Sequence, residues 1–580
     1  MIHDVGANLE IVMREHFECD ALHVQGRMYS YSDLHSRASA IRNVINEVVS
    51  YRNQFIGIFC YRSIDAYAGI VGTLFSKNAY LPINPFLPPE KINKILEISE
   101  CNVIILAEEA VDTFSKIISL QTRLTVICPN PGNKINELIK NNTDHIFICA
   151  DEFPTITINK GNVDKDDPSY LMFTSGSTGE PKGIVVSHKN LCSYANYIIK
   201  KYEFSFKDRI SQAPDISFDL SIQDIFSAFL SGGCLFVLPK EVMIAPHKYI
   251  NEHKLTVWTS VPSVGIFMDN IGQLLPNSLP TLRLTLFCGE GLPCKLASNW
   301  SRAAENSKVV NFYGPTEATV MFTEHKWDVD TETENCFNGL VSIGKPFNHM
   351  KIRLIENGNE VRDGSVGEIH ICGPQVIDGY FKDGKLTESK FIRFDGIDSE
   401  TWYRTGDLAK KLECGNYFFV GRADDQIQVR GHRIEMLEID NILRSVVGHH
   451  MAISIPVMSE DNNTAEDIVA FCTINDKNLS EEQILERCRL SLAEYMVPSK
   501  IYFLDVMPLN QNGKIDKKIL YNRVNDLTHK EVQPLNDNFA CGICLKGLSE
   551  DKKLDGFGLL KVINHDGTDG YICHICFKGF

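Results

Sequence analysis

A run of glycine, serine and threonine at residues 173–183, FTSGSTGEPKG, has the composition of a loop that holds phosphate. Glycines let a backbone bend where a side chain would clash, and hydroxyls beside exposed N–H groups can surround an anion. The residues concerned are Thr174, Ser175, Gly176, Ser177, Thr178, Gly179 and Gly183, with Lys182 supplying a cation. The G-x-x-x-x-G-K-S/T spacing of NTPases is absent. A surface turn is the alternative, but eleven consecutive residues of this kind favour a nucleotide-phosphate loop.

Four cysteines near the C-terminus have the spacing of metal ligands. Cys541-x-x-Cys544 and Cys573-x-x-Cys576 are separated by 28 residues, and two such pairs suit tetrahedral thiolate coordination of Zn2+. We predict a structural four-cysteine zinc site, because so short a segment needs a metal to supply its folding energy. His565 and His574 are substitute ligands, and a redox C-x-x-C is the less favoured alternative, because no βαβ pattern surrounds either pair.

The elements that must position these groups follow from the hydrophobic pattern. Apolar, strand-like runs at 55–59, 103–106 and 170–173 alternate with helix-like segments such as 63–78. This alternation continues to about residue 420 and predicts a layered α/β architecture. Beyond it the segments are shorter and more charged, with a helix expected over 480–496, which indicates a smaller α+β domain. We expect domains at 1–423 and 424–525, a polar linker at 526–538, and a zinc-ribbon-like module at 539–580.

Composition argues against several kinds of partner. The hydrophobic and charged fractions, 44% and 23%, are those of an ordinary globular protein. A formal net charge of −16 disfavours nucleic acid, and no apolar run approaches the roughly 20 residues that span a bilayer. The N-terminus lacks the basic start and apolar run of a signal peptide. We therefore expect a cytoplasmic protein with no membrane partner. Most of its 18 cysteines lie singly in apolar runs and are predicted to be reduced, buried thiols.

Further motifs lie in a fixed order along the chain. They are AYLPINP (79–85), NFYGPTEATV (311–320), YRTGDL (403–408), GRADDQIQVRGHRIE (421–435) and PLNQNGKIDKKIL (508–520). Together with the loop at 173–183, they make roughly residues 20–525 resemble the adenylate-forming superfamily of acyl-CoA synthetases, luciferases and nonribosomal peptide synthetase adenylation domains. Within that superfamily, FDLSIQDIF (218–226), VWTSVPS (257–263) and LFCGEGLP (286–293) are most similar to stand-alone D-alanine–carrier protein ligases.

This resemblance implies that ATP activates a carboxylic acid, a reaction that brings two anions together and depends on positioning and electrostatic stabilisation. Lys514 matches the catalytic lysine of the small domain, and Glu317 the residue that helps to hold Mg2+. Thr316 matches the residue that touches the α-phosphate. Without the resemblance, Lys514 reads as a solvated lysine after a turn and Glu317 as an acid at a helix start.

The resemblance also assigns the nucleoside contacts and a hinge. Tyr313 matches the residue that stacks on adenine, Asp407 the acceptor for the two ribose hydroxyls, and Arg422 a group that assists at the ribose or phosphate. Asp424 matches the hinge about which the small domain swings. One orientation brings Lys514 to the adenylate, and the other opens a tunnel for a pantetheine thiol.

The amino-acid pocket is carried over in the same way. Asp219, in an apolar neighbourhood where an unpaired carboxylate is costly, matches the acid that binds the substrate α-ammonium; a buried structural salt bridge is the alternative. Asp224 is a weaker candidate for this role. The side-chain pocket comprises Leu220, Gln223, Thr259, Leu286, Cys288, Phe312, Val320 and Met321.

Two features of this pocket bear on the substrate. The bulky Phe312 and Met321 favour alanine, glycine or serine, and Cys288 matches the cysteine that lines the D-alanine pocket. Gln223 departs from the pattern, because D-alanine enzymes commonly carry methionine there, and its amide could hydrogen-bond a hydroxyl or amide of the substrate. Asn84, where the family usually has Asp, is a second departure with no evident catalytic consequence.

We therefore expect an enzyme that adenylates a small amino acid and transfers the aminoacyl group to the phosphopantetheine thiol of a separate carrier protein. Its cofactors would be ATP, Mg2+ and structural Zn2+, with the cysteine module as a docking appendage. One alternative is an acyl-CoA synthetase with CoA as acceptor, against which Asp219 argues. The other is a non-catalytic scaffold, which the presence of Lys182, Glu317, Asp407 and Lys514 disfavours.

Overall fold

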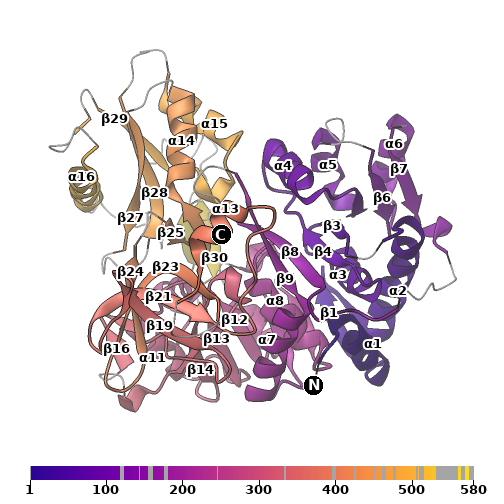
Figure 1. Ribbon diagram of the computed structural model, residues 1–580, viewed down its shortest axis with the longest axis horizontal. Helices are drawn as coiled ribbons and strands as arrows, with labels where there is room; N and C mark the ends of the chain where they lie inside the picture. Colours follow the sequence, from indigo (N-terminus) through magenta and orange to yellow (C-terminus); the bar gives the residue numbers. More distant parts are fainter. Residues whose placement is uncertain are drawn as a thin grey trace.

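The computed structural model describes most of the chain. Described are residues 2–51, 53–117, 123–142, 144–154, 161–174, 180–243, 246–331, 335–394, 400–423, 426–447, 451–459, 465–473, 479–504, 507–508, 515–530, 559–563 and 569–573. Within them, two large sheets, a third sheet and a separate small-domain sheet are connected by helices (Figure 1).

Nine of the described strands form one sheet, and its centre is parallel and buried. In spatial order they are β18 (Lys345–Pro346), β15 (Thr323–Lys326), β14 (Lys308–Tyr313), β13 (Leu284–Phe287), β12 (Val257–Ser260), β10 (Arg209–Gln212), β11 (Cys234–Val237), β1 (Asp20–Val24) and β2 (Arg27–Ser30). The five strands from β14 to β11 run parallel. Parallel strands covered on both faces read as continuous apolar runs, which is the pattern seen here.

Seven described strands form the second large sheet. Their order is β7 (Ile146–Cys149), β6 (Thr125–Cys128), β5 (Val103–Leu106), β3 (Phe55–Phe59), β4 (Ala79–Pro82), β8 (Pro168–Thr174) and β9 (Lys182–Ser187). The strands predicted at 55–59 and 103–106 are confirmed, and the helix between them is α3 (Ile64–Phe75), whose residues are all buried. Only the β8–β9 pair, which flanks the glycine-rich run, is antiparallel among these strands.

Helices cover both sheets and share their cores. They are α1 (Val5–Glu15), α2 (Tyr31–Val48), α4 (Pro89–Ser99), α5 (Val111–Ile117), α6 (Asn133–Asn141), α7 (His188–Lys201), α8 (Leu220–Phe229), α9 (His247–Glu252), α10 (Pro262–Asn270) and α11 (Cys294–Ala303). Side chains of α2, α3, α7 and α8 join those of both large sheets in one apolar cluster. The sequence prediction of a layered α/β architecture is confirmed.

A third, antiparallel sheet follows in the sequence. It contains β19 (Lys351–Glu356), β20 (Asn359–Glu360), β21 (Val366–Cys372), β22 (Phe391–Ile392), β23 (Trp402–Lys411) and β24 (Tyr417–Arg422), with α13 (Gly384–Lys390) before β22. Its strands β23 and β24 bring the YRTGDL and GRADD motifs side by side, because Asp407 and Arg422 are register partners. This sheet and the two large ones make up the large N-terminal domain.

The small C-terminal domain is α+β, as predicted, and lies at the upper left of Figure 1. Its elements are β25 (Gln426–Val429), β26 (His432–Glu435), α14 (Met436–Val447), β27 (Ala452–Met458), β28 (Ala465–Cys472), α15 (Glu481–Arg489), β29 (Lys500–Phe503) and α16 (Lys517–Lys530). The helix expected over 480–496 is shorter, because the chain turns after α15 and buries Leu492, Ala493 and Met496 in the domain core.

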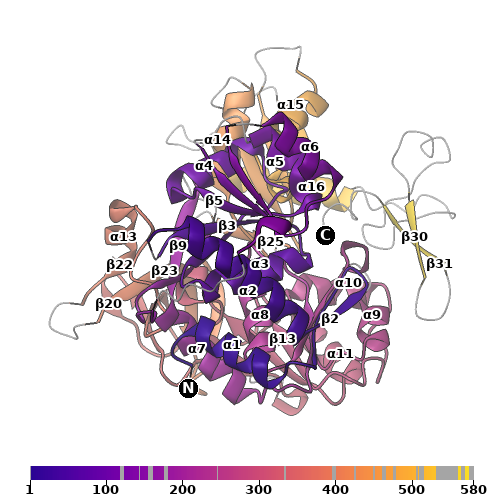
Figure 2. The ribbon, with the colours of Figure 1, turned by 90° about the vertical axis from the view of Figure 1, so that its right-hand side faces the viewer.

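The C-terminal segment is described only in part. β30 (Leu559–Ile563) and β31 (Asp569–Cys573) pair antiparallel and stand apart from the rest in Figure 2. Cys573 ends β31, whereas Cys541, Cys544 and Cys576 lie outside the described residues. The described residues contain no group of three or more His, Cys, Asp or Glu that could hold a metal ion, so the zinc site stays a prediction.

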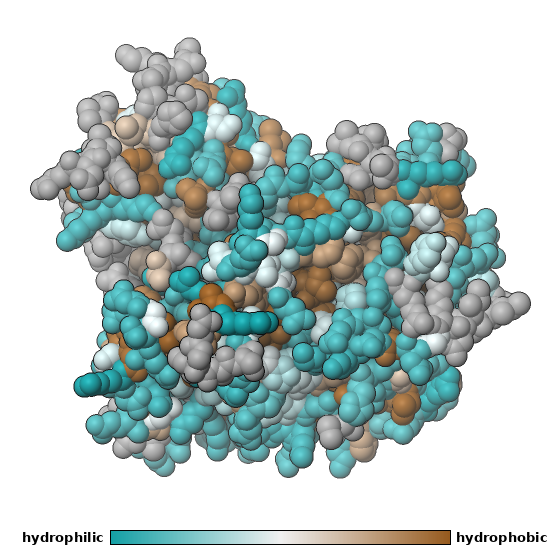
Figure 3. Space-filling model, in the orientation of Figure 1, coloured by the Kyte–Doolittle hydropathy of each residue, from teal (hydrophilic) through white to brown (hydrophobic). Residues whose placement is uncertain are grey.

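The surface and the helices can be compared with the expectation that no segment of the chain spans a membrane. Figure 3 shows a mostly polar face with scattered apolar patches. None of the described helices is both long enough and apolar enough to cross a bilayer.

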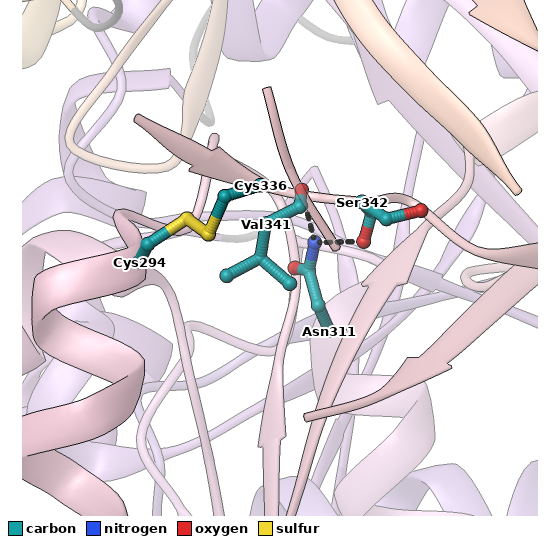
Figure 4. The surroundings of a disulfide bond; sticks show 5 residues. All are labelled: Cys294, Asn311, Cys336, Val341 and Ser342. Atoms are coloured by element: carbon teal, nitrogen blue, oxygen red, sulfur yellow. Dashed lines mark hydrogen bonds between the residues drawn. A yellow bond between two sulfur atoms is a disulfide. The ribbon is translucent and has the colours of Figure 1, made fainter. Parts of the chain in front are cut away.

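One disulfide corrects the sequence analysis, which predicted reduced thiols. Cys294, at the start of α11, is bonded to Cys336, at the start of β16 (Cys336–Phe337), across 42 residues (Figure 4). The following β17 (Leu340–Val341) is held against the segment before α11, since the Val341 N–H donates to Leu292 O at 2.8 Å. Asn311 of β14 donates to the carbonyl oxygens of Val341 and Ser342. This hairpin contact, which the sequence does not reveal, brings the two cysteines together.

Reduction of this disulfide is expected to destabilise the fold. Removing a cross-link over 42 residues frees the unfolded chain and costs about 2–4 kcal/mol of unfolding free energy. Chemical denaturation with and without reductant should show this loss in the native protein and not in a Cys294→Ser/Cys336→Ser double variant. Cys414→Ser, which removes an exposed free thiol, is the matched control. Equal thiol counts in denatured protein before and after reduction would contradict the disulfide.

Candidate active site

The three residues assigned to the nucleoside lie together at one edge of the third sheet. Tyr313, at the end of β14, donates its hydroxyl to Asp407 Oδ2 at 2.6 Å, and Arg422 forms an ion pair with the same carboxylate. The Asp407 N–H also donates to the Thr405 hydroxyl at 3.0 Å. Burial, with the Asp407 charge, raises the pKa of Tyr313 far above its usual range, so the phenol stays a donor.

Glu317 is buried and ionised beside this group. It belongs to the 3-10 turn Thr316–Ala318, which follows β14 after Gly314, where a Cβ would lie 2.6 Å from Val320 O. Tyr380 donates its hydroxyl to Glu317 Oε1 at 2.6 Å, and Arg433 Nη1 lies 3.0 Å from Oε2. Burial alone would raise the pKa of Glu317, but Arg433 and Tyr380 outweigh it and hold this pKa at about 2.

Lys182 lies opposite Thr174 on the β8–β9 pair, at the two ends of the glycine-rich run. Its Nζ is 2.6 Å from Oε1 of Glu435, which belongs to β26 of the small domain. Ser175, Gly176, Ser177, Thr178 and Gly179 lie outside the described residues, as do Lys514 and the predicted hinge Asp424. The cation expected at the phosphate loop is therefore paired here with a carboxylate of the other domain.

The turn between β25 and β26 inserts into the large domain. The Gly431 N–H donates to Glu290 Oε1 at 2.5 Å. Gly431 has φ +81°, and a Cβ there would lie 2.6 Å from Cγ1 of Val261. The next residue, His432, stacks on Tyr495 and meets the ring edge of Phe218, beside Asp219. We call this arrangement the docked orientation.

Two ion pairs across the domain boundary complement each other in the docked orientation. Arg433 pairs with Glu317 and Glu435 with Lys182, so β26 presents one cation and one anion to the large domain. Lys91 and Glu438 add a third pair at 2.6 Å. Sequence reasoning quoted the motifs that hold Glu290, Gly431, Arg433 and Glu435 but assigned these residues no part in the site; their place inside GRADDQIQVRGHRIE and LFCGEGLP was the available signal.

Strand register places the predicted pocket residues on one face of the nine-stranded sheet. Thr259 and Leu286 are register partners, so their side chains lie on the same face. Cys288 comes two residues after Leu286 and returns to this face. Phe312 follows Asn311, the register partner of Phe287, and therefore lies on this face as well. Helix α8 packs on this face. The pocket residues Leu220, Gln223, Thr259, Leu286, Cys288, Phe312, Val320 and Met321 are all buried. The structure thus brings the predicted set together.

Asp219 stands at the N-terminus of α8, at the mouth of this set. Burial raises its pKa to about 6, with the nearby Glu317 charge acting in the same direction. Hydrogen bonding to the Thr316 hydroxyl and to the Leu220 N–H opposes the shift. Asp219 therefore lies between the pocket and the turn that holds Glu317.

Two family descriptions match the chain. Residues 10–381 match the AMP-binding enzyme family, and residues 438–514 match the AMP-binding enzyme C-terminal domain. The chain belongs to the AMP-binding enzyme family, since the first match covers more than half of its 580 residues. It has the adenylation fold, with a large N-terminal and a small C-terminal domain.

Individual relatives refine this placement. Gramicidin S synthase 1 of Brevibacillus brevis is 29% identical over 510 residues, which are 86% of this chain but 42% of the synthase. The D-alanine--D-alanyl carrier protein ligase of Lacticaseibacillus casei (strain BL23) is 30% identical over 544 residues, or 90% of this chain and 100% of the ligase. The crystal structure of the Vibrio cholerae adenylation domain AlmE in complex with glycyl-adenosine-5'-phosphate has a TM-score of 0.81 and 28% identity, and the match covers 91% of this chain and 98% of AlmE. These matches confirm the superfamily predicted from the motifs.

Proposed function

We propose that this protein uses ATP to adenylate a small amino acid and then transfers the aminoacyl group to the phosphopantetheine thiol of a separate carrier protein. The observation that carries the proposal is the position of Asp219. Asp219 stands at the N-terminus of α8, beside the buried set of predicted pocket residues, and its carboxyl interacts with the Thr316 hydroxyl, near Glu317. An acid at this point would bind the α-ammonium and leave the substrate carboxylate directed at the phosphate groups.

In the first step a carboxylate oxygen of the amino acid attacks the α-phosphorus of ATP. The bond from that phosphorus to the bridging oxygen breaks, and pyrophosphate leaves with the electron pair. The Asp407 carboxylate, which Tyr313 and Arg422 hold in place, would accept hydrogen bonds from the two ribose hydroxyls. Lys182 would neutralise charge on the phosphate groups. Thr316 and Lys514 are assigned to the reacting phosphate by the family resemblance. These groups act by position and charge, the main sources of catalysis in such reactions.

Glu317 fits the expected Mg2+ ligand. Its carboxylate oxygens are the hard donors that this ion prefers. In the docked orientation Arg433 and the Tyr380 hydroxyl hold the pKa of this carboxyl at about 2, so it is ionised. In the docked orientation Arg433 pairs with this carboxylate, so the cation and Arg433 would compete for it. When bound, Mg2+ would supply charge neutralisation at the phosphate oxygens.

In the second step the carrier thiol loses its proton, its sulfur attacks the acyl carbon, and AMP leaves as the thioester forms. The docked orientation suits this step. In this orientation Arg433 pairs with Glu317, and Glu435 pairs with Lys182. Glu317 would face Mg2+ and Lys182 would face the phosphate groups during adenylation, but Mg2+ and pyrophosphate have left before the transfer step. Asp424 would act as the hinge between this orientation and the one that brings in Lys514. We also infer that Cys541, Cys544, Cys573 and Cys576 hold a structural zinc ion and that their module docks a partner.

The proposed function predicts pyrophosphate release from ATP that depends on a small amino acid. The panel is D- and L-alanine, glycine and D- and L-serine, with propionate as the acid without an amine. Aminoacyl thioester is then measured on pantetheine, CoA and a phosphopantetheinylated D-alanyl carrier protein. We expect release with one small amino acid, none with propionate, and transfer to the carrier well above transfer to CoA. A response to propionate alone, or preferential loading of CoA, would indicate an acyl-CoA synthetase instead.

A further inference from the structure

Three buried polar side chains beside or within the set of predicted pocket residues have hydrogen-bonding capacity that the proposed reaction does not use. They are Gln223 and Asp224 on α8 and Thr259 on β12, and each is 0% exposed. Gln223 is four residues after Asp219, and Asp224 four residues after Leu220, so both lie one helical turn, about 5.4 Å, below the mouth of the pocket. Thr259 lies on the sheet face that α8 covers.

Contacts tie this group to the substrate pocket. Gln223 Oε1 accepts a hydrogen bond from Tyr194, whose hydroxyl also lies 3.5 Å from the sulfur of the pocket residue Met321. The Thr259 hydroxyl, on the pocket wall, acts on the carboxyl of Asp224 and lowers its pKa in part, while burial raises it well above the usual range. Gln223 is thereby joined through Tyr194 to Met321, and Asp224 lies beside Thr259, so both polar residues of α8 adjoin predicted pocket residues.

Several polar atoms of these three side chains could form further hydrogen bonds. Among the described residues, none forms a well-shaped hydrogen bond with Gln223 Nε2, with either carboxyl oxygen of Asp224, or with the Thr259 hydroxyl. Buried polar groups without partners are costly, and such groups are normally satisfied. Their concentration beside a substrate pocket indicates that the substrate completes them.

We propose that the pocket selects an amino acid with a hydroxyl on its β-carbon, of the serine class, and that Gln223, Asp224 and Thr259 bind this hydroxyl. A hydroxyl donates one hydrogen bond and accepts others, so it can satisfy the Asp224 carboxyl and the Gln223 N–H together. The methyl of alanine gives no hydrogen bond to Gln223 Nε2 or to the carboxyl of Asp224. An ammonium only donates and leaves the Gln223 N–H groups unmet.

This inference rests on the proposed function and names its substrate. Serine is also short enough, because its hydroxyl is attached to the carbon next to the one that bears the ammonium at Asp219. Two ordinary hydrogen bonds of about 2.8 Å, one at each end of the substrate, then span the helical turn between Asp219 and Gln223. A site built to bind a substrate hydroxyl can reject the analogue that lacks it by about 10,000- to 100,000-fold.

The test compares kcat/KM for amino-acid-dependent pyrophosphate release. Substrates are both enantiomers of serine and alanine, glycine and 2,3-diaminopropionate, with wild type and the variants Gln223→Met, Asp224→Leu and Thr259→Val. We expect wild type to prefer one serine enantiomer over the matching alanine by at least about 100-fold. Each variant should lower that ratio by at least about 10-fold, whereas Ser227→Ala, one turn deeper on α8, should leave it unchanged.

Thermal unfolding without substrate gives a second readout. Asp224→Leu replaces a buried carboxyl that makes no well-shaped hydrogen bond among the described residues by an apolar side chain, and should therefore unfold at an equal or higher temperature than wild type. Gln223→Met also removes the acceptor of the buried Tyr194 hydroxyl and should unfold at a lower temperature. Alanine, glycine or 2,3-diaminopropionate used as well as serine would overturn the inference and leave the proposed function standing. So would an unchanged ratio in all three variants together with a lower unfolding temperature of Asp224→Leu, the result expected of a purely structural network. Silence to every amino acid would instead overturn the proposed function.

Discussion

Replacing Gly431 by alanine is expected to lower aminoacyl transfer at least about 100-fold while adenylate formation stays within about 3-fold of wild type. Gly431 has φ +81°, and a Cβ would lie 2.6 Å from Val261 Cγ1, a separation at which the turn must move. Moving it withdraws the N–H from Glu290 and shifts Arg433 from Glu317. A misplacement of about 1 Å in a catalytic arrangement can cost about 100-fold in rate. The proposed function assigns adenylation to the other orientation, in which we expect this contact to be absent.

The experiment separates the two half-reactions. ATP–pyrophosphate exchange measures adenylation, and thioester formation on the carrier measures transfer. Gly358→Ala is the matched control, because Gly358 has φ +80° in another turn and a Cβ there meets nothing within 4 Å. Adding Val261→Ala to Gly431→Ala should restore part of the transfer by removing the methyl that the new Cβ meets. Equal losses in both half-reactions, or none in either, would contradict the role given to the docked orientation.

The family resemblance, which rests on local motifs, was enough to select three residues that the structure brings together. Tyr313, Asp407 and Arg422 were predicted from three separate motifs, and the structure joins them through one carboxylate. Tyr313 and Arg422 end strands β14 and β24, and Asp407 lies within β23 opposite Arg422, so strand order and register determine where these side chains go. The pocket residues were assigned by the family resemblance, and strand register shows that Thr259, Leu286, Cys288 and Phe312 lie on one face of the sheet.

Contacts between domains were not predictable in this way. The pairs of Arg433 with Glu317 and of Glu435 with Lys182 join residues 116 and 253 positions apart, and they depend on how two separately folded domains meet. The disulfide was missed because it depends on a short hairpin docking before α11. The polar character of Gln223 was visible in the sequence. Only packing shows that its N–H groups and the carboxyl of Asp224 have no partner among the described residues.

Replacing Asp219 by asparagine is expected to lower kcat/KM for the amino acid by about 100- to 1,000-fold. That is the usual effect of leaving one charge of a buried pair, here the substrate ammonium, without its partner. The wild-type profile should depend on pH with a defined sign. Burial raises the pKa of Asp219 to about 6, and the ionised form binds the ammonium, so kcat/KM should rise with pH through about 6 and then level off. At pH 5 about a tenth of the carboxyl is ionised, giving roughly a tenth of the plateau. The variant should lack this rise.

The unfolding temperature of Asp219→Asn shows whether the substitution acts on substrate binding or on the stability of the fold. The folded-state pKa of Asp219, about 6, lies above its unfolded value of 3.8, so ionising the group opposes folding once the pH exceeds both. Asp219→Asn should therefore raise the unfolding temperature more at pH 8 than at pH 4, where the carboxyl is already protonated in the folded state. A variant that is folded and more stable at pH 8 but inactive toward the amino acid would establish Asp219 as the ammonium site. An unchanged pH profile with a lower unfolding temperature would assign it instead to a buried structural ion pair, the alternative that the sequence left open.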